Sequence, residues 1–389
     1  MENQKSNNKR MILLTIGILL GVMVILAAFG LKKAPNPVSS APTQTPTVDS
    51  PIVPTPTFTF YYLWQSSPHA KNDAVAFRHW DTADPQEIPK TCARCHSRPG
   101  FLDYLGVDGS AVGVVDSPAK IGTTITCYVC HNEATYALDS VIFPSGVRVG
   151  GLGPEARCIT CHQGRGSTSM VNIAIAKAAL ADDDTPSPDL AFINSHSTSA
   201  ATSFGSEVHG AYEYAGKTYR GRFTRGTEFF SCIRCHDQHS LKVKIETCGN
   251  CHTFDGTDTK NIRVNTTDFD GDGNITEGAY YEIQTMQTKL LEAIQTYARD
   301  VAKAPIVYDP AHHPNFFIDT NNNGVADPEE IVAKNKYISW TPRMLRAAYN
   351  LNYLTNDKGA YAHNSTYILQ ALYDSLADIG GDTSGMTRP

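Results

Sequence analysis

Five short motifs that contain every cysteine of the chain constrain its fold more than any other feature. All 10 cysteines lie in Cys-x-x-Cys-His sequences. The motifs are Cys92-Cys95-His96, Cys127-Cys130-His131, Cys158-Cys161-His162, Cys232-Cys235-His236 and Cys248-Cys251-His252. This is the attachment sequence of a c-type haem, in which both thiols bond to the haem and the histidine binds the iron. The sequence therefore predicts five covalent haem c groups.

Other interpretations of paired cysteines fit this pattern less well. A Cys-x-x-Cys pair can form half of a zinc site or a redox dithiol, and the segment Cys232–Cys251 could by itself pass for a zinc ribbon. Ten cysteines in an exported chain could also form disulfides. Neither zinc sites nor disulfides have a reason to place a histidine after every pair, and the chain has 13 histidines among 389 residues. The regular histidine favours haem.

The length and the net charge of the chain limit the number of domains and the kinds of binding partner. The chain has 389 residues, enough for one large or two ordinary domains, and its formal net charge is −6. No block of basic residues indicates nucleic-acid binding, so no nucleic-acid partner is expected. The propionates of the haems would add negative charge, which favours basic or cationic partners.

The N-terminus carries an export or anchoring signal. Residues 11–31 are uncharged and mostly apolar, and as a helix they would span roughly 32 Å, enough to cross a bilayer. Lys5, Lys9 and Arg10 precede them, as in a signal sequence. The stretch is longer than a typical cleaved signal, which favours a transmembrane helix, with cleavage after Gly30 as the alternative. Residues 1–33 should therefore anchor or export the chain, with the haem domain in the periplasm or outside the cell.

Composition divides the rest of the chain into three parts. Residues 34–58 are rich in Pro, Thr and Ser and predict a semi-rigid stalk, with simple disorder as the alternative. Residues 59–260 hold the motifs and should form a five-haem domain in which loops wrap the haems. Residues 261–389 should form a calcium-loop and helical region packed on that domain. The expected fold class is mainly α with extensive loops, with one small β-hairpin over Ala211–Phe223, where aromatic and polar residues alternate.

Helical periodicity is clearest near the C-terminus. Apolar residues recur at three- and four-residue spacing over Ile283–Val301, which predicts a helix with a packed apolar face. Two further helices are predicted over Pro342–Asn352 and Asn364–Ile379. Asn364 or Ser365 could cap the last one.

Eight histidines lie outside the motifs, enough to give every iron a second axial ligand. Histidine at both axial positions holds a haem at a lower potential than a His/Met pair. Local context favours five of these histidines as distal ligands: His69, His79, His196, His239 and His363. The remaining three are less favoured: His209, His312 and His313.

The chain resembles multihaem c-type cytochromes of the exported respiratory kind. The resemblance covers residues 60–380 and rests on the segments PHAKNDAVAFRHW, ARCITCHQGRGS, CHDQHSLKVKIETCGNCH and RAAYNLNYLTNDKGAYAHNSTYILQALYDSL. It implies that His239 and His363 serve as distal ligands. The closing helices resemble the helical end of the pentahaem nitrite reductases. Those enzymes carry a lysine motif at the catalytic haem, which this chain lacks, so nitrite reduction is not implied.

Two acidic segments near the C-terminus match calcium-binding loops. Residues 319–330 place oxygen donors at EF-hand positions and a glycine at the sharp turn. The expected ligands are Asp319, Asn321, Asn323, the Val325 carbonyl, Asp327 and Glu330. Residues 268–276 repeat the start of the pattern with Asp268, Asp270, Asp272 and Asn274. Its twelfth position is Ala279, so Glu277 or Glu282 would have to supply the missing carboxylate. One or two structural Ca²⁺ ions are expected.

Electron transfer is the function that these features favour. Closely packed bis-histidine haems pass electrons without binding a substrate, while the protein supplies ligands, spacing and electrostatics. Expected partners are redox proteins or a membrane quinol-oxidising complex. One alternative is a reductase of a small nitrogen or sulfur compound with one open haem. Another is self-association into a conducting filament, and a calcium-dependent adhesin is the least favoured. No catalytic residue is assigned, because an electron carrier is expected rather than an enzyme.

Overall fold

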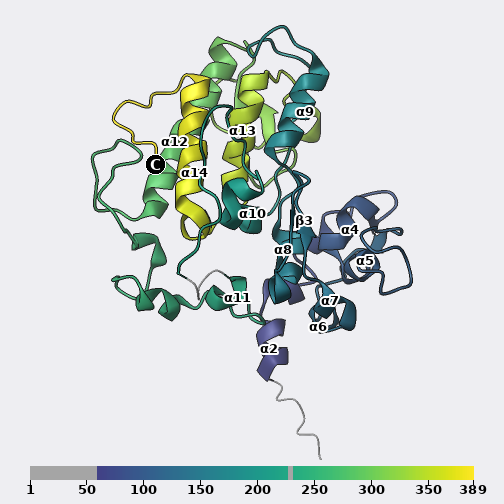
Figure 1. Cartoon of the computed structure of the whole chain (residues 1–389). Coiled ribbons are helices and arrows are strands. Elements are labelled where there is room, and N and C mark those ends of the chain that lie inside the picture. The colour runs from purple at the N-terminus through teal and green to yellow at the C-terminus, as the bar shows by residue number, and fades with distance from the viewer. Residues whose placement is uncertain (1–58, 227–230) are drawn as a thin grey trace, which may run out of the picture. The chain divides into compact units, whose positions relative to one another are not determined.

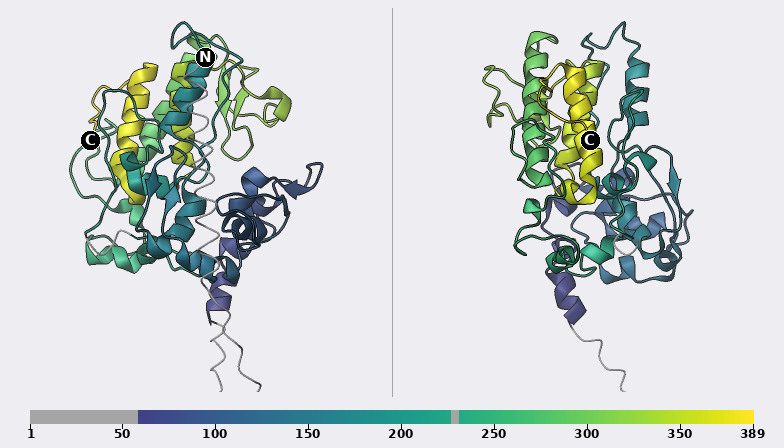
Figure 2. Two further views of the ribbon diagram at one scale, coloured as in Figure 1. Left: turned by 45° about the vertical axis from the view of Figure 1, so that its right-hand side comes forward. Right: turned by 60° about the vertical axis from the view of Figure 1, so that its left-hand side comes forward.

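Among the residues that the structure describes, three long helices near the C-terminus are the largest regular elements (Figure 1). They are α12 (Ala279–Asp300), α13 (Pro342–Thr355) and α14 (Ala360–Ile379), and each packs against the other two. Figure 2 shows them from two further directions. The computed structural model describes residues 59–226 and 231–389. The three helices predicted from periodicity are confirmed.

The predicted membrane anchor, residues 1–33, and the predicted stalk, residues 34–58, lie outside the described residues. Across the part that is described, we find no helix that combines the length and the apolar character needed to span a membrane.

Burial of one apolar face explains α12. Met286, Leu290 and Ile294 are four residues apart and fully buried, so they lie on one side of the helix. They belong to the main hydrophobic cluster, which also contains Tyr349 of α13 and Leu369 of α14. This cluster is a conventional side-chain core that joins the three helices to buried residues between Val141 and Tyr219.

Side-chain caps set the start of α13 and the bend in α14. The Thr341 hydroxyl accepts a hydrogen bond from the Met344 N–H (3.1 Å), as an N-cap does. Asn364 has a non-helical backbone inside α14, and its Oδ1 accepts a hydrogen bond from the Tyr367 N–H (3.3 Å). Of the two predicted capping residues, Asn364 fills the role, and the bend follows directly after His363.

The region before α12 consists of short helices and loops. The α-helices are α2 (Thr59–Gln65), α3 (Val75–Arg78), α4 (Lys90–His96), α5 (Arg98–Tyr104), α6 (Cys127–Cys130), α7 (Glu133–Ala137), α8 (Ala156–His162), α9 (Thr168–Ala178), α10 (Ser199–Phe204) and α11 (Cys232–Cys235). The 3-10 helices among the described residues are η1 (Pro68–Ala70), η2 (Gly153–Glu155), η3 (Gly205–Glu207), η4 (Ile245–Asn250), η5 (Thr259–Asn261) and η6 (Ala333–Asn335). The architecture is mainly helical with extensive loops, as predicted.

Strands are short, and the predicted hairpin over Ala211–Phe223 is wrong. In the described part of the chain the strands pair as three antiparallel two-stranded sheets: β1 (Glu87–Ile88) with β2 (Ala119–Lys120), β3 (Val141–Ile142) with β4 (Arg148–Val149), and β5 (Ile306–Tyr308) with β6 (Phe316–Ile318). Residues 211–223 contain a turn, in which the Lys217 N–H donates to the Tyr214 carbonyl (3.2 Å), but no strand.

The backbone of residues 211–223 is satisfied by helix side chains instead of by a second strand. The Ala211 N–H donates to the Tyr367 hydroxyl (3.1 Å), and the Tyr212 N–H donates to Asn350 Oδ1 (2.7 Å). The Arg220 N–H donates to Gln370 Oε1 (2.7 Å). Polar side chains of α13 and α14 therefore replace the ladder that the alternating pattern suggested.

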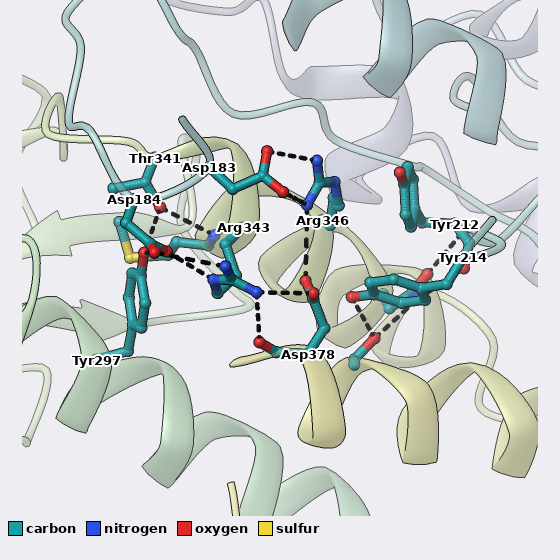
Figure 3. Close-up of polar contacts among 12 residues, drawn as sticks. Asp183, Asp184, Tyr212, Tyr214, Tyr297, Thr341, Arg343, Arg346 and Asp378 are labelled. Carbon is teal, nitrogen blue, oxygen red and sulfur yellow. Dashed lines mark hydrogen bonds and ion pairs between the residues drawn. The ribbon is translucent and has the colours of Figure 1, made fainter. Parts of the chain in front are cut away.

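An ion-pair network clamps the loop after α9 to α13 and α14 (Figure 3). Arg346 binds both carboxylate oxygens of Asp183, each at 2.8 Å, and Arg343 binds Asp184 at 2.6 Å. Arg343 also binds Asp378 of α14 at 2.8 Å. The hydrogen bonds from these arginines hold the pKa of Asp183 and of Asp184 below the ordinary carboxyl value, whereas burial raises the pKa of Asp378.

Replacing Arg346 with methionine should lower the melting temperature at neutral pH and have less effect in acid. The folded-state pKa of Asp183 is depressed, so its stabilising contribution is present above about pH 3.9 and is lost as the pH falls through the folded value. Its side chain is 42% exposed, and the expected loss at neutral pH is therefore no more than about 1 kcal/mol.

Melting curves of the holo-protein from about pH 7 to about pH 3 test this expectation. The difference between wild type and Arg346→Met should shrink as the pH falls. Arg299→Met is the matched control, because Arg299 pairs with the exposed Asp300 on the surface of α12 and should not change the melting temperature. A difference that is the same at every pH would show that the Asp183 charge plays no part.

Candidate haem sites

Each motif closes one turn of helix, which brings its two thiols to one side. The first and third motifs end α4 and α8, and the second and fourth form α6 and α11. In the fifth motif the His252 N–H donates to the Cys248 carbonyl (2.9 Å), and the same bond joins His236 to Cys232 (2.8 Å). Residues i and i+3 of a helical turn share a face, so both sulfurs can reach one haem edge.

Four of the five motif histidines face a second histidine. The ring centroids are 6.4 Å apart for His96 and His196, 6.3 Å for His131 and His239, 6.4 Å for His162 and His69, and 6.4 Å for His236 and His363. Two imidazoles on opposite sides of one metal, each with a bond of about 2.0 Å, have centroids about 6.3 Å apart. The gap between the rings therefore fits one iron.

The Nδ1 atoms of these histidines are occupied, which leaves Nε2 for a metal. His96 Nδ1 lies 2.7 Å from the Ala76 carbonyl, and His131 Nδ1 lies 2.8 Å from the Tyr136 hydroxyl. His162 Nδ1 lies 3.0 Å from the Ser197 hydroxyl. A neutral imidazole that donates from Nδ1 presents a lone pair at Nε2, and such partners orient metal-binding histidines.

Two of the second histidines, His363 and His196, are held in the same way. His363 Nδ1 lies 2.8 Å from a carboxylate oxygen of Asp357, a buried residue. Asp357 was not among the predicted site residues, because nothing in the spacing of Asp357 and His363 along the sequence signals this contact. His196 Nδ1 lies 2.9 Å from Asn194 Oδ1, and the His196 backbone is in the left-handed region, with φ 58°. Strained backbone of this kind is found at functional sites.

Burial keeps two of these rings neutral. It lowers the pKa of His69 to about 4, with a smaller contribution from His162. Burial also lowers the pKa of His196 to about 4, and the positive charge of Arg165 is the second cause of this lowering. Neutral imidazole is the form that binds iron, so both rings have the required protonation state at neutral pH.

The fifth predicted distal ligand, His79, does not face a motif histidine. Its ring faces His313, with centroids 6.5 Å apart. All 13 histidines belong to the described residues, and no ring contact joins a second histidine to His252 there. Of the other less favoured histidines, His209 lies against Glu213 and His312 against Asp309.

The third motif lies at the centre of the motif arrangement. Cys161 Sγ is 3.8 Å from the Arg94 carbonyl within the first motif. Arg157 donates to the Cys130 carbonyl of the second motif (2.9 Å), and Glu155 accepts from the Cys232 N–H of the fourth (2.6 Å). The segment 155–162 therefore contacts three other motifs.

The fifth motif joins this arrangement through the fourth. The Lys244 N–H donates to the Cys235 carbonyl (2.8 Å), and the Thr247 N–H donates to the Lys244 carbonyl (2.9 Å). Helix α11 also packs against η4, which contains Cys248. These contacts arrange four motifs in a row, in which the first contacts the third, the third contacts the fourth and the fourth contacts the fifth. The second motif contacts the third as a side branch.

Acidic side chains converge in the loop that starts at Asp268. Asp270, Asp272 and Glu277 place carboxylate oxygens within 4.8 Å of one another, as do Asp268, Asp270 and Glu282. One buried oxygen of Asp270 and one of Glu277 have no hydrogen-bond partner. Burial raises the pKa of Glu277 to about 7, and the negative charges of the neighbouring acids are the second cause. These crowded, unsatisfied oxygens fit a hard divalent cation.

Glu282 has a different position from Glu277. One of its oxygens pairs with Arg263 at 2.6 Å, and the other accepts from the N–H groups of Phe269 and Asp270. Both carboxylate oxygens of Glu282 therefore already have partners, and they stabilise the backbone of the loop. Of the two predicted replacements for the missing calcium ligand, Glu277 is the better one. Asn274, the last expected ligand of this loop, has its amide 3.5 Å from Glu277.

The loop over residues 319–330 is folded around its own side chains. Asp319 accepts from the Gly324 N–H (2.8 Å), and Asp327 accepts from the amides of Asn321 and Asn323 (2.8 and 2.9 Å). Glu330 reaches back to the Thr320 N–H (2.6 Å). Val325 is exposed, and its N–H donates to the Asn323 side chain (2.7 Å). The oxygens of this loop do not form a three-acid group within the described residues.

Known proteins with similar sequences are polyhaem c-type cytochromes. The chain is 25% identical over 367 residues to the C-type polyheme cytochrome OmcB of Geobacter sulfurreducens, which covers 78% of this chain and 45% of OmcB. It is 25% identical over 352 residues to OmcC of the same organism, which covers 73% of this chain and 42% of OmcC. The chain thus spans less than half the length of these relatives.

No family model and no solved structure matches the chain. The five motifs and the polyhaem relatives together support a multihaem c-type cytochrome with covalently bound haem c.

Proposed function

We propose that this chain is an exported pentahaem cytochrome that transfers electrons between redox partners. The observation that carries the proposal is the set of four histidine pairs at 6.3–6.4 Å. An iron with a histidine on each side has no free position for a substrate, and it has a lower potential than one with a His/Met pair. The chemistry that bound haem would supply is reversible one-electron transfer.

The order of the motifs suggests a path for electrons. The haem of the third motif would lie between the first and fourth, and the fifth would continue from the fourth. The haem of the second motif would form a side branch. Redox proteins or a membrane quinol-oxidising complex would be the partners at the ends of this path, and transient contacts of limited area would suffice for exchange.

Low-temperature magnetic circular dichroism of the oxidised holo-protein in the near infrared tests the ligation directly, because its band positions separate His/His from His/Met irons. We expect four irons per chain with the His/His signature. A signal dominated by high-spin or His/Met irons would refute the proposal.

The fifth motif supports a second candidate function. No histidine faces His252 in the described residues, so its haem is the best candidate for an open iron. Such an iron could bind and reduce a small nitrogen or sulfur compound, with electrons supplied by the four closed haems. The test is whether nitrite or hydroxylamine oxidises the fully reduced protein with turnover.

Calcium should stabilise the C-terminal part. Asp270, Asp272 and Glu277 would form one site, and residues 319–330 a second, both with a structural role. Removing calcium leaves like charges close together, so exhaustive chelation should lower the melting temperature. At a free concentration 100 times the dissociation constant, calcium contributes about 2.7 kcal/mol per site.

Differential scanning calorimetry with and without added Ca²⁺ measures this effect. Asp272→Asn should reduce the calcium-dependent shift, whereas Asp300→Asn, at an exposed position in α12 where the carboxylate pairs with Arg299, should leave it unchanged. Tightly bound calcium that is removed without any change in melting temperature would contradict the structural role.

A further inference from the structure

Two histidines outside the motifs are arranged like the pairs at the proposed haem irons. The rings of His79 and His313 have centroids 6.5 Å apart and are perpendicular, at 90°. The pair formed by His96 and His196 has nearly the same geometry, 6.4 Å and 87°. Neither His79 nor His313 belongs to a Cys-x-x-Cys-His motif, and both are exposed.

His313 lies on a turn that is tied to the His196 segment. The turn joins β5 to β6, and its Asn315 accepts a hydrogen bond at Oδ1 from the side-chain amide of Asn194 (2.8 Å). Asn194 Oδ1 in turn lies 2.9 Å from His196 Nδ1. One asparagine therefore links the backbone that carries His313 to the histidine opposite the first motif.

His79 is linked to the same motif by a tryptophan. His79 follows directly after α3, and its ring lies edge-on to Trp80 with centroids 5.1 Å apart. Trp80 also lies edge-on to His96, with centroids 5.2 Å apart. The pair of His79 and His313 is therefore next to the first haem site, at the end of the motif order opposite to the fifth.

The separation of the rings favours ligands on opposite sides of a metal. Two imidazoles on a tetrahedral ion such as Zn²⁺ would have centroids about 5 Å apart, given bonds of about 2.0 Å. The value of 6.5 Å fits a linear arrangement, as in a haem iron with two histidines. Neither residue belongs to a group of three or more metal-binding side chains among the described residues.

We propose that His79 and His313 bind the iron of a sixth, non-covalent haem at the surface beside the first covalent haem. This inference rests on the proposed bis-histidine ligation of the covalent haems, which supplies the reference distance. Such a haem would extend the electron path beyond the first motif through Trp80. Its exposed position would make it the point of contact for a partner at that end.

Haemin titration of the purified full-length holo-protein tests the proposal. Difference spectra should saturate at one haemin per chain, and cold acidified acetone should extract that haem while leaving the covalent haems on the protein. Both His79→Ala and His313→Ala should lose the binding. His312→Ala is the matched control, because this exposed neighbour of His313 pairs with Asp309 and should bind haemin like the wild type.

The proposal is overturned if no haemin binds, or if it binds equally to the wild type and to both variants. Spectra taken before haemin is added report the ligation of the covalent haems, so failure of the proposed function is seen separately. An unchanged covalent haem content in each variant shows that the variant folds.

Discussion

Replacing His363 with alanine should open one iron to carbon monoxide. His363 faces His236 at 6.4 Å, and Asp357 fixes its ring from behind with contacts of 2.8 and 2.9 Å. The backbone bends at Asn364, directly after His363, and α14 continues as a buried helix from there. The variant should bind about one further equivalent of carbon monoxide per chain after reduction, and its oxidised form should gain a high-spin signal.

A graded variant and a control sharpen this experiment. Asp357→Asn keeps the side-chain shape but removes the charge, and losing such a partner typically weakens a histidine ligand by about 10- to 100-fold. It should therefore show partial opening of the iron. His209→Ala removes an exposed histidine that pairs with Glu213, and it should leave the carbon monoxide stoichiometry unchanged. If His363→Ala binds the same number of carbon monoxide molecules per chain as the wild type, His363 is not the ligand opposite His236.

Loss of the third haem should break the electron path, while loss of the second should not. The double variant Cys158→Ala/Cys161→Ala removes the attachment of the haem whose segment contacts three other motifs. The first haem would then be separated from the fourth and fifth. The variant Cys127→Ala/Cys130→Ala also lacks one haem, but it leaves the first, third, fourth and fifth in sequence.

Protein-film voltammetry distinguishes the two double variants. With the second haem missing, the remaining haems should exchange electrons with the electrode as fast as in the wild type. With the third haem missing, a fraction of the remaining haems should exchange electrons with the electrode more slowly than in the wild type. The reason is that electrons must cross the gap left by the missing haem. The variant His69→Ala is the control for a folding defect. It leaves the third haem attached and changes only its axial ligand. Equal kinetics in both double variants would show that the order of motifs does not define the path.

Local sequence patterns predicted the parts of the structure that depend on neighbouring residues. The periodicity of Met286, Leu290 and Ile294 predicted α12, because one buried face is enough to fix a helix. Asn364 was one of two candidate caps, and the structure uses it. The hairpin over residues 211–223 was wrong because α13 and α14 supply hydrogen bonds that no local pattern reveals.

Histidine pairing depends on contacts between distant segments. The motif sequences identify His96 as an iron ligand, but only the fold brings His196 opposite to it. His313 was among the less favoured histidines, yet its turn is held against the His196 segment by Asn194 and Asn315. The choice between Glu277 and Glu282 likewise depended on Arg263, which occupies Glu282.

Carbon monoxide titration of the dithionite-reduced full chain, normalised to covalent haem, tests the central claim most directly. Four histidines of the motifs are paired, and no second histidine faces His252 within residues 59–226 and 231–389. We therefore propose that about one equivalent of carbon monoxide binds per chain, at the His252 haem. No binding would keep the electron-transfer function and remove the second candidate. Binding of two or more equivalents would contradict the account, because at least one of the four histidine pairs would not be closing its iron.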